Sequence, residues 1–221
     1  MRFLDRVLRK AGSKDRPTAE AGWLPGRFSD LEEAHRLARE KHWLEALAVV
    51  DHLLGIPEDP DVAKGYLREL MKNEAPAGID PPQMMGRDIT GAERIKFRLR
   101  MGGGLVSSIM GFRSQCYSGA IAEIAKTHGA SSRSPCVVIG GSDPDLSRMA
   151  RKAFGHVGIC MELFKDDPDC LALAAAVCHT LGQFDVAQSL LSRSLELDPG
   201  NGYARELMPV TMRRLEEFRD R

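Results

Sequence analysis

Residues 170–201 read CLALAAAVCHTLGQFDVAQSLLSRSLELDPGN, and the two halves of this stretch have the composition of packed helices. The first half is rich in alanine, which lets a neighbouring helix approach closely. In the second half, leucines recur at helical spacing and fill one face of a helix: Leu190, Leu191 and Leu195. A Leu-Gly pair at 181–182 separates the halves. The stretch therefore predicts two helices that pack against one another.

The spacing of small and large residues in this stretch also follows a known pattern. Small residues come before a Leu-Gly pair, and an aromatic residue, an alanine, a leucine and an Asp-Pro pair come after it: Ala174, Ala175, Cys178, Leu181, Gly182, Phe184, Ala187, Leu191, Asp198 and Pro199. This order resembles the tetratricopeptide repeat. The resemblance implies two antiparallel helices with a tight turn at Gly182, a close crossing at Ala187 and a proline that closes the unit. Leu171 and Ser194 depart from the family's usual residues.

Two further copies of the pattern are predicted. Residues 27–58 contain WLEALAVVDHLL, which has the spacing of the family's second helix, although Lys41 replaces the turn glycine. A weaker copy spans residues 101–132 and contains Tyr117, Ala120 and Ile124. The alanines at 46, 120 and 187 are 74 and 67 residues apart, close to twice the family's period of about 34.

These observations predict a mainly α-helical chain of stacked antiparallel hairpins, a TPR-like α-solenoid, with room for a small α/β element in the middle. The C-terminal tail is expected to cap the array with Leu215 and Phe218. The predicted organisation has four parts: a basic leader and linker (1–25), N-terminal hairpins (26–72), a divergent middle segment (73–167), and a C-terminal hairpin with its capping helix (168–221).

Composition excludes several classes of protein. The 221 residues contain 31 basic and 31 acidic side chains and are 43% hydrophobic. This composition is typical of a folded protein, and the chain has no net positive charge that would attract nucleic acid. Its five cysteines form no CxxC pair and are predicted to be reduced thiols in the cytoplasm. Residues 1–10 are predicted to form a short basic amphipathic helix, for which we expect at most weak peripheral membrane contact.

The middle segment breaks the helical pattern. Residues 94–101 alternate basic and apolar side chains like a strand, yet Thr90 and Glu93 form a capping box that predicts a helix, and both interpretations stay open. Residues 136–139 form a short β-branched run, followed by a glycine turn and by Pro144 at the first position of a helix.

The glycine-rich turns of the middle segment offer an alternative function. Backbone N–H groups at helix N-termini can bind an anion, so a small ligand-binding or transferase module could hold a phosphate or nucleotide at Gly102, Gly103, Gly104, Gly140, Gly141 and Ser142. Against this stand the absence of a GxGxxG or P-loop motif and the negative charges of Asp143 and Asp145.

No catalytic constellation is predicted. His35, His42 and His52 lack a third ligand for a metal ion. Cys160, Cys170 and Cys178 are interpreted as core residues, and the acidic residues near 166–169 as caps of a helix that starts near Cys170. We therefore name no catalytic residue, no metal site and no cofactor.

The TPR resemblance implies a scaffold or adaptor that binds another protein on a concave surface lined by the first helices of the hairpins. The residues predicted on that surface are His35 and Arg39 in the first hairpin and His179 and Thr180 in the last. No nucleic acid partner is expected.

Overall fold

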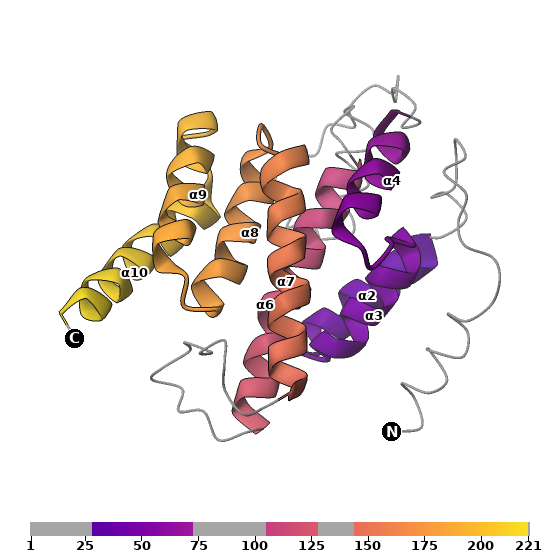
Figure 1. Cartoon of the computed structure of the whole chain (residues 1–221), viewed down its shortest axis with the longest axis horizontal. Helices are drawn as coiled ribbons and strands as arrows, with labels where there is room; N and C mark the ends of the chain where they lie inside the picture. The colour runs from indigo at the N-terminus through magenta and orange to yellow at the C-terminus, as the bar shows by residue number, and fades with distance from the viewer. Residues whose placement is uncertain (1–27, 73–104, 128–143, 221) are drawn as a thin grey trace, which may run out of the picture. The chain divides into compact units, whose positions relative to one another are not determined.

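The computed structural model describes residues 28–72, 105–127 and 144–220 (Figure 1). Within these ranges the chain forms helices and no strand, which confirms the mainly α-helical prediction: α2 (Phe28–Arg39), α3 (Trp43–Leu54), α4 (Pro60–Lys72), α6 (Leu105–Thr127), α7 (Pro144–Leu163), α8 (Pro168–Thr180), α9 (Phe184–Leu197) and α10 (Gly202–Arg219). The leader and the proposed strands at 94–101 and 136–139 lie outside the described residues.

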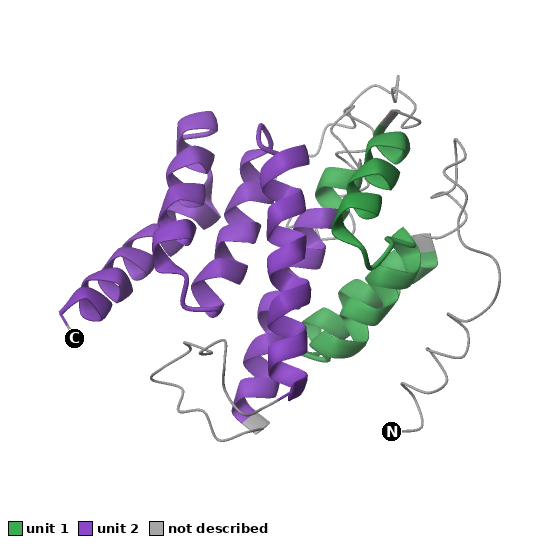
Figure 2. Cartoon of the chain, in the orientation of Figure 1, with its two compact units in different colours: residues 1–109 green, residues 110–221 purple. Residues whose placement is uncertain are grey.

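The chain divides into two compact units, residues 1–109 and 110–221 (Figure 2). In the first unit, α2 packs along α3, because both helices turn an apolar face inward that includes the fully buried Ala34, Ala46 and Val50. The Tyr66 hydroxyl of α4 donates a hydrogen bond to the Leu54 carbonyl at the end of α3, with 3.0 Å between the oxygens.

In the second unit, each helix from α7 to α10 packs against the next one along the chain, and α10 also contacts α8. Alanine makes this packing possible at the centre of α8, where Ala172, Ala174 and Ala175 are fully buried. Small side chains on α8 allow its neighbours to approach closely. The core of this unit is therefore built around α8.

The long helical stretch that the sequence predicts from Gly104 to about His128 is confirmed, but the two helices of a repeat copy at 101–132 are not seen in the described part of this range. Residues Leu105–Thr127 form one continuous helix, α6, with Tyr117 and Ala120 fully buried near its middle. Its sequence has no proline and only two isolated glycines, Gly111 and Gly119, and single glycines cost a helix about 1 kcal/mol each, which the burial of the helix offsets.

The helix boundaries near 144 and 168 follow the predictions. Pro144 is the first residue of α7. The Asp167 carboxylate accepts a hydrogen bond from the Cys170 N–H at 2.9 Å and so caps α8. In α10, Leu215 is buried as expected, but Phe218 is 63% exposed, so its predicted packing on the array is wrong. Phe218 lies in the last turn of α10, three residues beyond Leu215, and points off the packed face.

Candidate functional site

The connection between α7 and α8 and the connection between α9 and α10 have matching hydrogen bonds, 34 residues apart. The Asn201 side chain accepts from the Ala204 N–H at 2.9 Å, as Asp167 accepts from Cys170. Two backbone bonds before each cap also match. In the first connection, the N–H of residue 164 donates to the carbonyl of residue 160 at 2.9 Å, and the N–H of 167 donates to the carbonyl of 164 at 3.0 Å. In the second connection, the N–H of 198 donates to the carbonyl of 194 at 2.9 Å, and the N–H of 201 donates to the carbonyl of 198 at 3.0 Å. The two connections therefore have the same pattern of local hydrogen bonds.

Two side-chain hydrogen bonds join α8 to α10 directly. The Asn201 amide donates to the Asp169 carboxylate at 2.8 Å, at the N-terminal ends of the two helices. His179 Nδ1 lies 3.0 Å from the Thr211 hydroxyl, near the C-terminal end of α8 and the middle of α10. The two bonds thus join α8 to the first half of α10.

The 34-residue period assigns an equivalent position on α10 to each position of α8. Positions 169, 176 and 180 of α8 correspond, 34 residues on, to positions 203, 210 and 214 of α10. Spacings of seven and four residues keep each set on one helix face. We call this the α8/α10 surface, and its residues are Asp169, Ala176, Thr180, Tyr203, Val210 and Arg214.

One predicted partner-binding residue, Thr180, lies on this surface, and its neighbour His179 lies beside it. The Thr180 hydroxyl donates to the Ala176 carbonyl within α8 at 2.8 Å. The His179 ring contacts the edge of Phe184, with 5.2 Å between ring centroids. Burial, and then the positive charge of Arg214, lower the pKa of His179, so its neutral form is favoured where it meets Thr211.

The other predicted partner-binding residues, His35 and Arg39, lie on α2 in the first compact unit. Arg39 is exposed, whereas His35 is mostly buried. Burial, and then the positive charge of Arg39, lower the pKa of His35 to about 4. The imidazole of His35 is therefore neutral at pH 7 and belongs to the packed side of α2. The glycine-rich turns at 102–104 and 140–142 lie outside the described residues.

A buried polar cluster between α6 and α7 was not predicted from the sequence. Arg113 Nη1 lies 3.1 Å from His156 Nδ1, and the Ser114 hydroxyl lies 2.7 Å from His156 Nε2. All three side chains are buried, and the guanidinium of Arg113 lies 5.1 Å from the centre of the Tyr117 ring. The residue that could have indicated this cluster is His156, a polar residue on the buried face of α7 that also contains Ala153 and Cys160.

The hydrogen-bond partners of His156 indicate which tautomer of its ring fits this cluster. Arginine can only donate, so Nδ1 of His156 is the acceptor and Nε2 carries the hydrogen. That Nε2–H donates to Ser114, whose hydroxyl donates in turn to the Met110 carbonyl at 3.2 Å. The cluster therefore ties α7 to α6.

Cys160 extends this cluster, with its sulfur 3.6 Å from His156 Nε2. A hydrogen bond from Cys170, and then the contact with His156, lower the pKa of the Cys160 thiol, whereas burial acts in the opposite direction. Since both ring nitrogens of His156 are already used, His156 has no lone pair with which to take a proton from Cys160. The geometry does not form a cysteine–histidine catalytic dyad.

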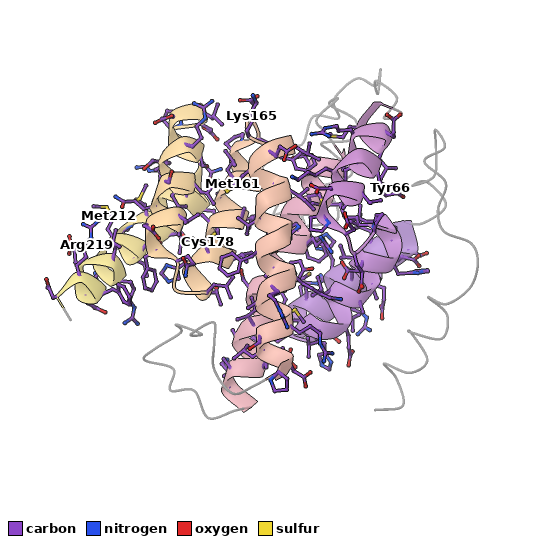
Figure 3. All side chains as sticks on the ribbon, viewed as in Figure 1. Tyr66, Met161, Lys165, Cys178, Met212 and Arg219 are labelled. Carbon is purple, nitrogen blue, oxygen red and sulfur yellow. The ribbon has the colours of Figure 1, made fainter. Side chains whose placement is uncertain are left out.

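Cys170 and Cys178 are core residues, as predicted, and Cys116 is a core residue for which no such prediction was made. Cys116, Cys170 and Cys178 are buried, and Figure 3 shows Cys178 within the second unit. Burial, together with the charge of Cys160, raises the pKa of Cys178 to about 12. The Cys178 thiol is therefore protonated at neutral pH and serves as a small apolar side chain.

Neither a metal centre nor a membrane span is found in the described part of the chain. Within residues 28–72, 105–127 and 144–220, His, Cys, Asp and Glu side chains form no group of three that could hold a metal ion. No helix in these ranges is both long and apolar enough to cross a bilayer. In comparisons with known proteins, no protein family, no curated protein and no solved structure matches this chain.

Proposed function

We propose that residues 144–219 form a TPR-like array and that the chain binds another protein on the α8/α10 surface. The observation that carries this proposal is the set of equal backbone hydrogen bonds 34 residues apart, in the connections at 164–170 and 198–204. A period of about 34 residues is typical of TPR arrays, whose first helices line a shared surface.

The same period relates α7 to α9. Ala153, Val157 and Cys160 of α7 correspond to Ala187, Leu191 and Ser194 of α9, and all six side chains are buried. In this proposal α7 and α9 are the second helices of successive units, while α8 and α10 are first helices. Helix α8 also packs in the core, with Ala176 buried, so α10 contributes most of the exposed part of the α8/α10 surface.

The composition of the α8/α10 surface suits a peptide ligand with apolar anchors. Tyr203 and Val210 are each 46% exposed and provide apolar contact area. Thr180 and Arg214 border them with polar groups, and the side chain of Arg214 is 31% exposed. Exposed tyrosine and arginine are the residue types that contribute most often to binding energy at protein interfaces.

A peptide-display selection against the whole protein tests the proposal. We expect selected peptides to lose about tenfold or more in affinity on Val210→Glu, because a carboxylate would replace an apolar contact. Met212→Ala is the matched control, since Met212 is an exposed apolar residue of the same helix, 43% exposed, outside the α8/α10 surface. If peptides bind both variants equally, the surface is wrong.

A further inference from the structure

Exposed apolar side chains are concentrated on the last helix of the described chain. Six large apolar residues are exposed in the described residues, and four of them lie on α10: Tyr203, Val210, Met212 and Phe218. Large apolar side chains that gather on one element, rather than being scattered singly, mark an interaction surface.

Most of this area forms a single stripe. Tyr203, Leu207, Val210, Arg214 and Phe218 follow one another at spacings of four, three, four and four residues, which places them on one side of the helix. Ala204, Thr211 and Leu215 form the separate, buried face of α10. The stripe runs over the full helix of 18 residues, about 27 Å.

We propose that this stripe pairs with the same stripe of a second copy of the chain, with the two α10 helices antiparallel. A two-fold axis makes the same patch face itself, so the patch must be self-complementary. The charges beside the stripe meet this requirement. Glu206 and Arg214 lie four residues before and four residues after Val210, so in an antiparallel pair centred on Val210 each Glu206 lies opposite Arg214 of the second copy.

The apolar residues of the stripe are also complementary under this symmetry. Val210 lies opposite Val210 of the second copy at the centre, and Tyr203 falls beside Phe218 of the second copy at each end. An antiparallel pair therefore places Glu206 beside Arg214 and Tyr203 beside Phe218, each contact occurring twice, with the single Val210–Val210 contact on the axis. In a parallel pair, Glu206 would face Glu206 and Arg214 would face Arg214.

The size of the stripe sets the expected strength of the pair. A single helix face buries less than the area of a standard protein interface, which is typical of a weak and reversible complex. We expect a dissociation constant on the order of 10 µM. Because Tyr203, Val210 and Arg214 also belong to the α8/α10 surface, the second copy would compete with the protein partner proposed above.

Sedimentation equilibrium of the full chain from about 1 to about 200 µM tests the pairing. We expect a monomer–dimer equilibrium whose dissociation constant rises about tenfold in Glu206→Arg and in Arg214→Glu, because each change brings like charges together. The double variant Glu206→Arg/Arg214→Glu should restore the wild-type constant to within about threefold, since it exchanges the two charges. Circular dichroism verifies that each variant keeps its helix content.

Met212→Ala provides the control for loss of apolar area. Met212, which Figure 3 shows on α10, lies two residues from Val210 and therefore about 200° around the helix. Its removal should leave the dissociation constant unchanged. A chain that stays monomeric over the whole range, or a double variant no tighter than the single variants, overturns the proposal. At chain concentrations below 1 µM, about tenfold or more below the expected dissociation constant of the dimer, the chain is monomeric. Peptide binding measured at these concentrations therefore tests the proposed partner surface separately from the pairing.

Discussion

The turn between α2 and α3 and the turn between α8 and α9 have the same backbone shape but different residues. In the first turn, the Lys41 N–H donates to the Ala38 carbonyl at 3.1 Å, and the His42 N–H donates to the Leu37 carbonyl at 2.9 Å. The backbone of Lys41 has a φ of 65°, in the left-handed region that side chains other than glycine rarely adopt.

In the second turn, the Gly182 N–H donates to the His179 carbonyl at 3.0 Å, and the Gln183 N–H donates to the Cys178 carbonyl at 2.9 Å. Gly182 has a φ of 76° and pays no steric penalty there. The two turns therefore show that helix packing and backbone hydrogen bonds set this geometry, since the chain adopts it with lysine as well as with glycine.

The correspondence continues into the second helix of each hairpin. The Ala46 N–H donates to the His42 carbonyl and the Ala187 N–H to the Gln183 carbonyl, both at 2.9 Å. Ala46 and Ala187 are both completely buried. The closest approach of the two helices thus depends on the same small residue, five positions after the left-handed one.

The largest expected effect comes from enlarging these alanines. Ala46→Leu or Ala187→Leu should lower the free energy of unfolding by about 3 kcal/mol, because three extra carbon atoms must enter a filled space. Urea denaturation measures the change. Ser189→Leu is the control, since Ser189 is exposed on α9 and should change stability by about 0.5 kcal/mol or less. A loss equal to that of Ser189→Leu would show that the helix crossing is loose.

The second prediction concerns pH and separates the two hairpins. His35 of α2 corresponds to the apolar Ala176 of α8, so only the first hairpin has a titrating side chain at this position. The pKa of His35 is about 4 in the folded chain, below its unfolded value of about 6.5. Between pH 6.5 and pH 4 the unfolded state binds a proton that the folded state does not. The free energy of unfolding is therefore fully present above pH 6.5 and decreases as the pH falls toward 4.

We expect this loss to be on the order of 2 kcal/mol. Urea denaturation at pH 7 and at pH 4.5 should show a smaller difference for His35→Gln than for the wild type, because glutamine does not titrate. His42→Gln is the control, since His42 is exposed. If both variants show the wild-type difference, His35 is not the group responsible.

The smallest effect tests the turns themselves. Gly182→Lys should cost about 1 kcal/mol, since it places a side chain in the left-handed region. Lys41→Gly should gain about 0.5 kcal/mol, because relief of the same strain exceeds the entropy that glycine adds to the unfolded chain. Thermal unfolding measures both changes. Opposite signs support a common geometry, and a loss of stability in Lys41→Gly contradicts it.

The sequence was sufficient to predict the hairpin α8–α9 in detail. Gly182 lies in the predicted turn, Ala187 and Cys178 are buried, and an aspartate caps the first helix. These features depend on residues close together in the chain, whose conformational preferences act locally. The sequence also predicted that Lys41 takes the place of the turn glycine in the first hairpin, because the residues on both sides of Lys41 follow the spacing of the repeat.

Features that depend on residues distant in sequence were not predicted. The cluster of Arg113, Ser114 and His156 joins residues 42 and 43 positions apart, and nothing near either segment indicates the contact. The hairpin expected within 101–132 failed because alanine and aromatic spacing is common to any buried helix. The pairing of positions in α8 and α10 became visible only through the equal hydrogen bonds of their connections.

The contacts of α8 with its neighbours have a kinetic consequence. Helix α8 packs against α7, α9 and α10, so its partners are helices next to it in the chain or one helix further on. Proteins whose contacts join nearby residues have low contact order and fold rapidly. The backbone amides of α8, shielded by three neighbours, are therefore the ones that will exchange with deuterium last, while those of α10 will exchange early through local fraying.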